Sequence, residues 1–135
     1  MNKRSETNTL ARGVVCDELK KRGFPVVPSG LNFLINEKRI NVKGCNSDNK
    51  WVQKEKSGPV WDKLNPKKFD YFVCVAFYNR FNNARYFIFS SADVEQFPNV
   101  IWNNMPELRK IMINPTDKKL CQIIKSSENG WEKIR

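Results

Sequence analysis

Asn32, Asn41 and Lys43 lie close together in the sequence, on two short apolar segments separated by a polar break. The asparagines offer amide oxygens, which can ligate a cation but carry no negative charge. The lysine adds a compact positive charge. Because a site made of these three groups is net positive, it suits the oxygens of a phosphate better than a divalent metal ion. These three residues are therefore the first candidates for a functional site in this chain.

A β-hairpin must position these side chains. Residues 31–35 and 39–43 are mostly apolar or β-prone, and the polar stretch 36–38 supplies a short turn between them. Gly44 closes the second strand. We expect Asn32 on the first strand and the other two residues on the second.

The remaining patterns predict an α/β fold, with a single mixed β-sheet flanked by helices in one domain over residues 1–135. The continuous apolar run 71–78 is typical of a central strand buried on both faces. The other predicted elements are a helix over 6–22, a short extended piece over 24–27, an irregular basic stretch over 44–68, a strand over 85–90, and helices over 91–97, 104–111 and from 114–116 through 124. Trp131 and Ile134 are expected to fold back onto the core.

The charge of the chain points to an anionic partner. Lysine and arginine number 24 against 14 acids, which gives a formal charge of +10 and a pI of about 9.6. Nucleic acid is the commonest partner of such a domain, an anionic membrane surface is the rival, and a solvated basic surface is the third possibility. No apolar run approaches the ~20 residues that span a bilayer, and the polar start has no signal-peptide pattern, so we expect a cytoplasmic protein.

The sequence excludes several kinds of active site. It contains no histidine, which removes Ser-His and Cys-His catalysis and histidine-ligated metals. Its four cysteines are far apart and none has the C-x-x-C spacing of a zinc site. Carboxylate, lysine or tyrosine chemistry is what remains for an enzyme.

The order of these elements resembles the PD-(D/E)XK nuclease superfamily, with its restriction-endonuclease-like fold, and is closest to the small archaeal-type Holliday-junction resolvases. The resemblance covers nearly the whole chain. The matching pieces are the helix end at residues 18–24, the hairpin from Asn32 to Lys43, and the strands at 70–75 and 86–90.

The resemblance implies a catalytic site with defined roles. In the family, a helix glutamate and two hairpin acids hold Mg²⁺, which activates water, and a lysine two residues after the second acid stabilises the transition state. By position the hairpin acids fall on Asn32 and Asn41 and the lysine on Lys43. The helix acid falls near Arg12, or on Glu18 in a shifted register.

The departures from this pattern imply a degenerate site, so the sequence leaves open whether the protein is an enzyme. No cofactor is expected. Mg²⁺ or Mn²⁺ would bind only if Glu18, Asp48 or Asp70 restores negative charge from another position, or if a different hairpin register makes Glu37 relevant.

The stretch from Lys43 to Lys68 carries seven lysines against three acids, and it is the most basic long internal segment. Phosphate contacts are expected from a set of basic residues: Lys43, Lys50, Lys54, Lys56, Lys67, Lys68, Arg80 and Arg85. A solvated loop is the alternative. Trp51 and Trp61 are candidates to stack on bases, and the alternative for both is to anchor the loop onto the core.

These observations lead to three hypotheses. The first is a nucleic-acid-binding protein with a catalytically degenerate nuclease fold, for which DNA is favoured over RNA without excluding it. The second is an active metal-dependent endonuclease with a rearranged site. The third is a basic protein-interaction module of the immunity or inhibitor type. The resemblance also makes a homodimer a possibility.

Overall fold

The computed structural model describes residues 3–48, 58–100 and 105–135 of the chain. Its elements, in chain order, are α1 (Lys3–Lys21), β1 (Val26–Ser29), β2 (Asn32–Ile35), β3 (Lys38–Asn46), β4 (Val60–Leu64), β5 (Tyr71–Tyr78), β6 (Asn83–Ser90), α3 (Ser91–Val94), β7 (Asn99–Val100), β8 (Met105–Met112), α4 (Lys118–Ser127) and the 3₁₀ helix η2 (Trp131–Ile134).

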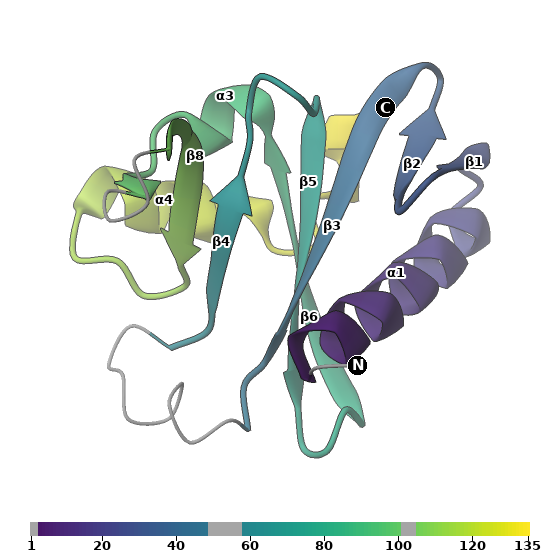
Figure 1. The fold of residues 1–135 in the computed structure, drawn as a ribbon, viewed down its shortest axis with the longest axis horizontal. Helices are drawn as coiled ribbons and strands as arrows, with labels where there is room; N and C mark the ends of the chain where they lie inside the picture. The colour runs from purple at the N-terminus through teal and green to yellow at the C-terminus, as the bar shows by residue number, and fades with distance from the viewer. Residues whose placement is uncertain (1–2, 49–57, 101–104) are drawn as a thin grey trace.

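A five-stranded mixed sheet forms the centre of the fold, in the order β1-β2-β3-β5-β6. The neighbours β3 and β5 run parallel, and the other pairs are antiparallel. Figure 1 shows α1 on one side of this sheet, and β4, β8 and α4 on the other. The expected α/β architecture with a mixed sheet is confirmed.

Two hydrophobic cores lie on the two faces of the sheet. On one face, Ala11, Val15 and Leu19 of α1 pack with Val73 and Val75 of β5. On the other face, a second group of buried side chains packs together: Trp61, Leu64, Phe72, Cys74, Phe87 and Ile111. Since side chains alternate along a strand, the continuous apolar run of β5 supplies both cores, as its sequence predicts.

The predicted hairpin is present as β2 and β3. Ile35 pairs with Lys38, so the turn consists of Asn36 and Glu37 alone. Both adopt the left-handed conformation, with φ of 50° and 68°, as a two-residue hairpin turn requires. The second strand extends to Asn46, beyond its predicted end at residue 43.

A second sheet, β4-β8-β7, was not predicted, and it corrects two expectations. The predicted helix over 104–111 is wrong, because β8 occupies Met105–Met112. The predicted irregular stretch over 44–68 contains β4. Trp61 of β4 pairs with Ile111 of β8, and both side chains are buried. This pairing between distant segments overrides the local sequence pattern that predicted a helix.

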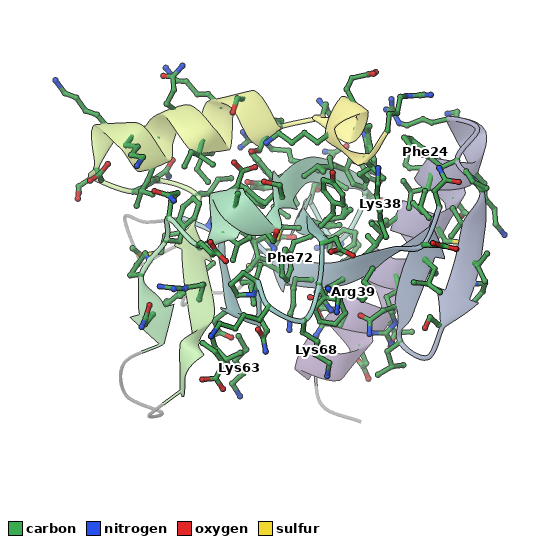
Figure 2. All side chains as sticks on the ribbon, turned by 90° about the horizontal axis from the view of Figure 1, so that it is seen from above. Phe24, Lys38, Arg39, Lys63, Lys68 and Phe72 are labelled. Atoms are coloured by element: carbon green, nitrogen blue, oxygen red, sulfur yellow. The ribbon has the colours of Figure 1, made fainter. Side chains whose placement is uncertain are left out.

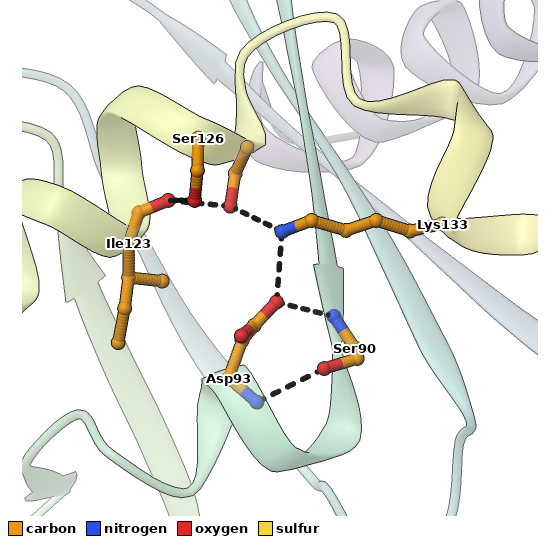
Figure 3. Close-up of polar contacts among 6 residues, drawn as sticks. Ser90, Asp93, Ile123, Ser126 and Lys133 are labelled. Atoms are coloured by element: carbon orange, nitrogen blue, oxygen red, sulfur yellow. Dashed lines mark hydrogen bonds and ion pairs between the residues drawn. The ribbon is translucent and has the colours of Figure 1, made fainter.

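The C-terminal segment is fixed by buried side chains and by a polar network. Trp131 and Ile134 are buried in the core on the α1 face, as expected. Lys133 donates to Asp93 of α3 over 2.9 Å and to Ser127 of α4 over 2.8 Å (Figure 3). Asp93 also caps α3 together with Ser90. One lysine therefore joins α3, α4 and η2.

Among the described residues, no helix has the length and apolar character needed to cross a membrane.

Candidate functional site

The candidate site lies where β2 and β3 diverge. The pair Phe33–Ile40 ends the ladder between the two strands, and Asn32 and Asn41 occupy the next opposed positions. Asn41 Nδ2 donates a hydrogen bond of 2.8 Å to Asn32 Oδ1, and both side chains are partly buried. The structure therefore brings together the two asparagines that the sequence singled out.

Lys43 lies on the same face of β3 as Asn41, because side chains two residues apart in a strand point the same way. Its neighbour in register on β5 is the buried Cys74. Burial raises the pKa of the Cys74 thiol, while the nearby ammonium group of Lys43 acts in the opposite direction. The lysine is partly buried beside the second hydrophobic core.

A third amide reaches this part of β3 from α1. The backbone N–H of Gly44 donates to Asn8 Oδ1 over 2.9 Å. This contact needs a glycine, because a Cβ on Gly44 would lie 2.9 Å from both the Cβ of Ala11 and the carbonyl oxygen of Thr7. The sequence reasoning placed the helix acid near Arg12 or Glu18 and missed Asn8. The signal was the small residue Ala11 one helical turn after Thr7, which together mark the part of the helix that lies against a strand.

The contact between Asn32 and Asn41 determines the electrostatics of the site. Two carboxylates this close would repel each other unless a cation or a proton lay between them. Two amides form a hydrogen bond directly and need neither. Asn41 and Lys43 lie on the face of the sheet opposite to α1 and Asn8, because their register partners Phe72 and Cys74 belong to the second core. The polar groups that share that face are therefore the amides of Asn32 and Asn41 and the ammonium of Lys43.

The acids that were considered as substitute metal ligands are engaged elsewhere. Asp70 accepts hydrogen bonds from the backbone and the guanidinium of Arg39, which hold the pKa of Asp70 below its usual value. Asp48 accepts the backbone N–H groups of Asn79 and Arg80. Glu37 is exposed in the turn of the hairpin.

Glu18 is not brought to the site. Its carboxylate pairs with Arg22 at 3.4 Å, one helical turn further on. It lies ten residues after Asn8, which is roughly 15 Å along the helix axis at 1.5 Å per residue. Arg12 donates to Thr9 on the same helix. Across residues 3–48, 58–100 and 105–135, no three acidic, cysteine or histidine side chains form a group that could hold a metal ion.

The predicted nucleic-acid contacts are only partly described by the structure. Lys50, Trp51, Lys54 and Lys56 lie outside the described residues. Lys67 and Lys68 are exposed in the turn that follows β4. Figure 2 places Lys68 and Lys63 on the side of the molecule opposite to α4.

The expectation that Trp61 stacks on bases is wrong. Its side chain is 2% exposed, and its indole N–H donates to the carbonyl oxygen of Val75 over 3.0 Å. The ring packs against Phe87 in the second core. Trp61 therefore anchors β4 onto the central sheet, which is the alternative that the sequence allowed.

The two candidate arginines have different surroundings. Arg85 forms two hydrogen bonds with the carboxylate of Glu128, at 2.8 and 2.9 Å, which raise the pKa of Arg85 and lower that of Glu128. Its charge is therefore largely balanced. Arg80 is exposed in the connection between β5 and β6.

The comparison with solved structures finds a similar fold. The bacterial homing endonuclease I-Ssp6803I superimposes with a TM-score of 0.62, over 98% of this chain and 93% of that one, at 16% sequence identity. No family model matches the chain, and no curated protein matches it in sequence. The chain therefore has a nuclease-like α/β fold.

Proposed function

We propose that this protein binds nucleic acid through a degenerate PD-(D/E)XK-type site that holds a backbone phosphate instead of a metal ion. The observation that carries the proposal is the hydrogen bond between Asn41 and Asn32. It places two neutral amides beside Lys43, at the strand positions where the resemblance expects metal-binding acids. The nuclease-like fold and the charge of +10 support the same proposal.

The groups of the site suit a phosphate chemically. Lys43 supplies a positive charge and N–H donors, and charge-assisted hydrogen bonds to phosphate are among the stronger ones. Asn41 Nδ2 carries a second N–H besides the one that it donates to Asn32, and Asn32 Nδ2 carries two. Double-stranded DNA is the polynucleotide that we propose, because the resemblance is to enzymes that act on DNA.

Further contacts would come from exposed lysines outside the site formed by Asn32, Asn41 and Lys43. Lys63, Lys67 and Lys68 lie on or directly after β4, and all are exposed. A polyanion bound at Lys43 would gain additional phosphate contacts from such residues. Each contact releases counterions, so the affinity should fall steeply as salt increases.

The test is the affinity of a labelled DNA duplex, measured by fluorescence anisotropy in EDTA between about 50 and 200 mM salt. We expect the logarithm of the binding constant to fall linearly with the logarithm of the salt concentration. Lys43→Ala should weaken binding to all sequences and reduce the slope by about one. Lys20→Ala, an exposed lysine in the last turn of α1, is the matched control. Binding that is undetectable or insensitive to salt contradicts the proposal.

A further inference from the structure

The connection between β5 and β6 has an unusual backbone. Asn79, Arg80 and Phe81 all adopt the left-handed conformation, with φ of 53°, 55° and 66°. Side chains with a Cβ disfavour this region, and three such residues in a row persist only where the surroundings enforce them. We call residues 79–83 the tip. None of them is a glycine, although glycine is the usual choice for such a backbone.

The tip is fixed from the neighbouring strand. The carboxylate of Asp48, just after the end of β3, accepts the N–H of Asn79 over 3.2 Å and the N–H of Arg80 over 2.6 Å. The N–H of Asn82 donates to the carbonyl oxygen of Asn79. The ring of Phe81 packs on that of Phe77, with the centroids 5.2 Å apart. The tip is therefore held in one shape in the absence of a partner.

The side chains of the tip match the edges of nucleic-acid bases. Arg80, Asn82 and Asn83 are exposed, and Phe81 is 40% exposed. Arginine recognises guanine and asparagine recognises adenine with paired hydrogen bonds, and apolar side chains contact the thymine methyl group. The tip contains no acid, and among the described residues no ion pair neutralises the Arg80 guanidinium.

The position of the tip relates it to the candidate site. Because β3 and β5 are parallel and paired, the tip projects at the end of the sheet towards which β3 runs after Lys43 (Figure 1). Lys43 is in register with Cys74, five residues before Asn79, which is roughly 17 Å along the strand. One turn of a DNA duplex is about 34 Å long, so one duplex is long enough to contact both.

We propose that the tip is the sequence-reading element of this protein, contacting base edges in a groove of the duplex whose backbone Lys43 binds. This inference rests on the proposed function. The inference is supported by the difference between the candidate site and the tip. The groups around Lys43 are neutral or positive and suit a phosphate, while the tip presents an exposed aromatic ring and exposed amides. A phosphate-binding surface alone has no need of an exposed phenylalanine.

The experiment is a selection from a randomised duplex library, followed by anisotropy titrations of the selected and the unselected DNA. We expect the unmodified protein to enrich a sequence. Phe81→Ala and Arg80→Ala should lose about tenfold in affinity for the selected duplex and little for unselected DNA. Phe81→Ala should leave the salt slope unchanged, because it removes no charge. Lys43→Ala should weaken both duplexes equally.

A further pair of variants tests the positioning by Asp48. Asp48→Ala should reduce the preference for the selected duplex, and Asp48→Asn, which keeps one acceptor oxygen, should recover part of it. Circular dichroism and thermal melting of each variant establish that it is folded. The inference is overturned if salt-dependent binding persists but no sequence is enriched, or if the tip variants prefer the selected duplex as strongly as the unmodified protein does. If the unmodified protein binds neither the selected nor the unselected duplex, the proposed function itself is overturned.

Discussion

The side chain of Asn41 donates a hydrogen bond of 2.8 Å to the side chain of Asn32 across the diverging strands β2 and β3. From the sequence, Asn32 and Asn41 are two separate departures from the hairpin acids of the nuclease pattern. In the structure the two departures complement each other, because an amide pair is stable at a distance where two carboxylates would repel. The two side chains therefore need no cation between them.

The double variant N32D/N41D should acquire a dependence on divalent metal ions. At neutral pH its two carboxylates would repel, so its melting temperature should fall below that of the unmodified protein. Added Mg²⁺ or Mn²⁺ should restore it, and a ligand at a hundred times its Kd stabilises by about 2.7 kcal/mol. Differential scanning calorimetry with and without metal measures this change.

The control for this experiment is N82D/N114D, which adds the same charge at two exposed positions. Its melting temperature should respond weakly to the metal. Equal responses of the two double variants would mean that Asn32 and Asn41 do not form a latent metal site.

Gly44→Ala should destabilise the fold by about 1–3 kcal/mol, because the new methyl group overlaps Ala11 and the backbone of Thr7. Gly13→Ala is the matched control. Gly13 lies on the exposed face of α1, with nothing within 4 Å of a built Cβ, and alanine should stabilise the helix by about 0.5–1 kcal/mol. Urea denaturation gives both values, and a Gly44→Ala protein as stable as the unmodified one contradicts the close approach of α1 to β3.

Lys133→Met should cost about 1–3 kcal/mol of stability, since it removes the donor shared by Asp93 and Ser127 in a partly buried network. Lys125→Met, at an exposed position of α4, should change the free energy of unfolding by less than about 0.5 kcal/mol. If both variants unfold at the same urea concentration, the network contributes little to holding the C-terminal segment.

Stability should decrease in acid through two paired carboxylates. The ordinary pKa values of Asp70 and Glu128 are 3.8 and 4.5, and hydrogen bonds from Arg39 and Arg85 lower the pKa of each in the folded protein. The unfolded chain therefore binds these protons first, and the stabilisation present above pH 4.5 is lost as the pH falls through the lowered values. The double variant D70N/E128Q should show a shallower decrease over this range, and an unchanged decrease would contradict the role of the two pairs.

Local signals were sufficient to predict the hairpin and the central strand. The turn residues Asn36 and Glu37 and the alternating apolar positions of β2 and β3 lie within a few residues of one another. The continuous apolar run of β5 follows from burial on both faces. These elements place Asn32, Asn41 and Lys43, so the centre of the site was predictable.

The second sheet and the third amide were not predictable in the same way. β4 and β8 are joined by pairs such as Trp61–Ile111, between residues far apart in sequence, and neither strand is stable alone. Asn8 reaches β3 only because Gly44 lets α1 approach closely, a relation that spans thirty-six positions. The sequence allowed Trp61 either to stack on bases or to anchor its segment onto the core, and its burial supports the second interpretation.

We propose that the protein binds DNA at Lys43 and the two asparagines without needing or using a divalent metal ion. One gel-retardation series, with a labelled duplex in EDTA or in Mn²⁺, tests it most directly. We expect equal retardation in both buffers and full-length DNA recovered from each complex. Cleavage that depends on Mn²⁺ and is lost in Lys43→Ala, or retardation only when Mn²⁺ is present, would contradict it and show that carboxylates from elsewhere complete an active site.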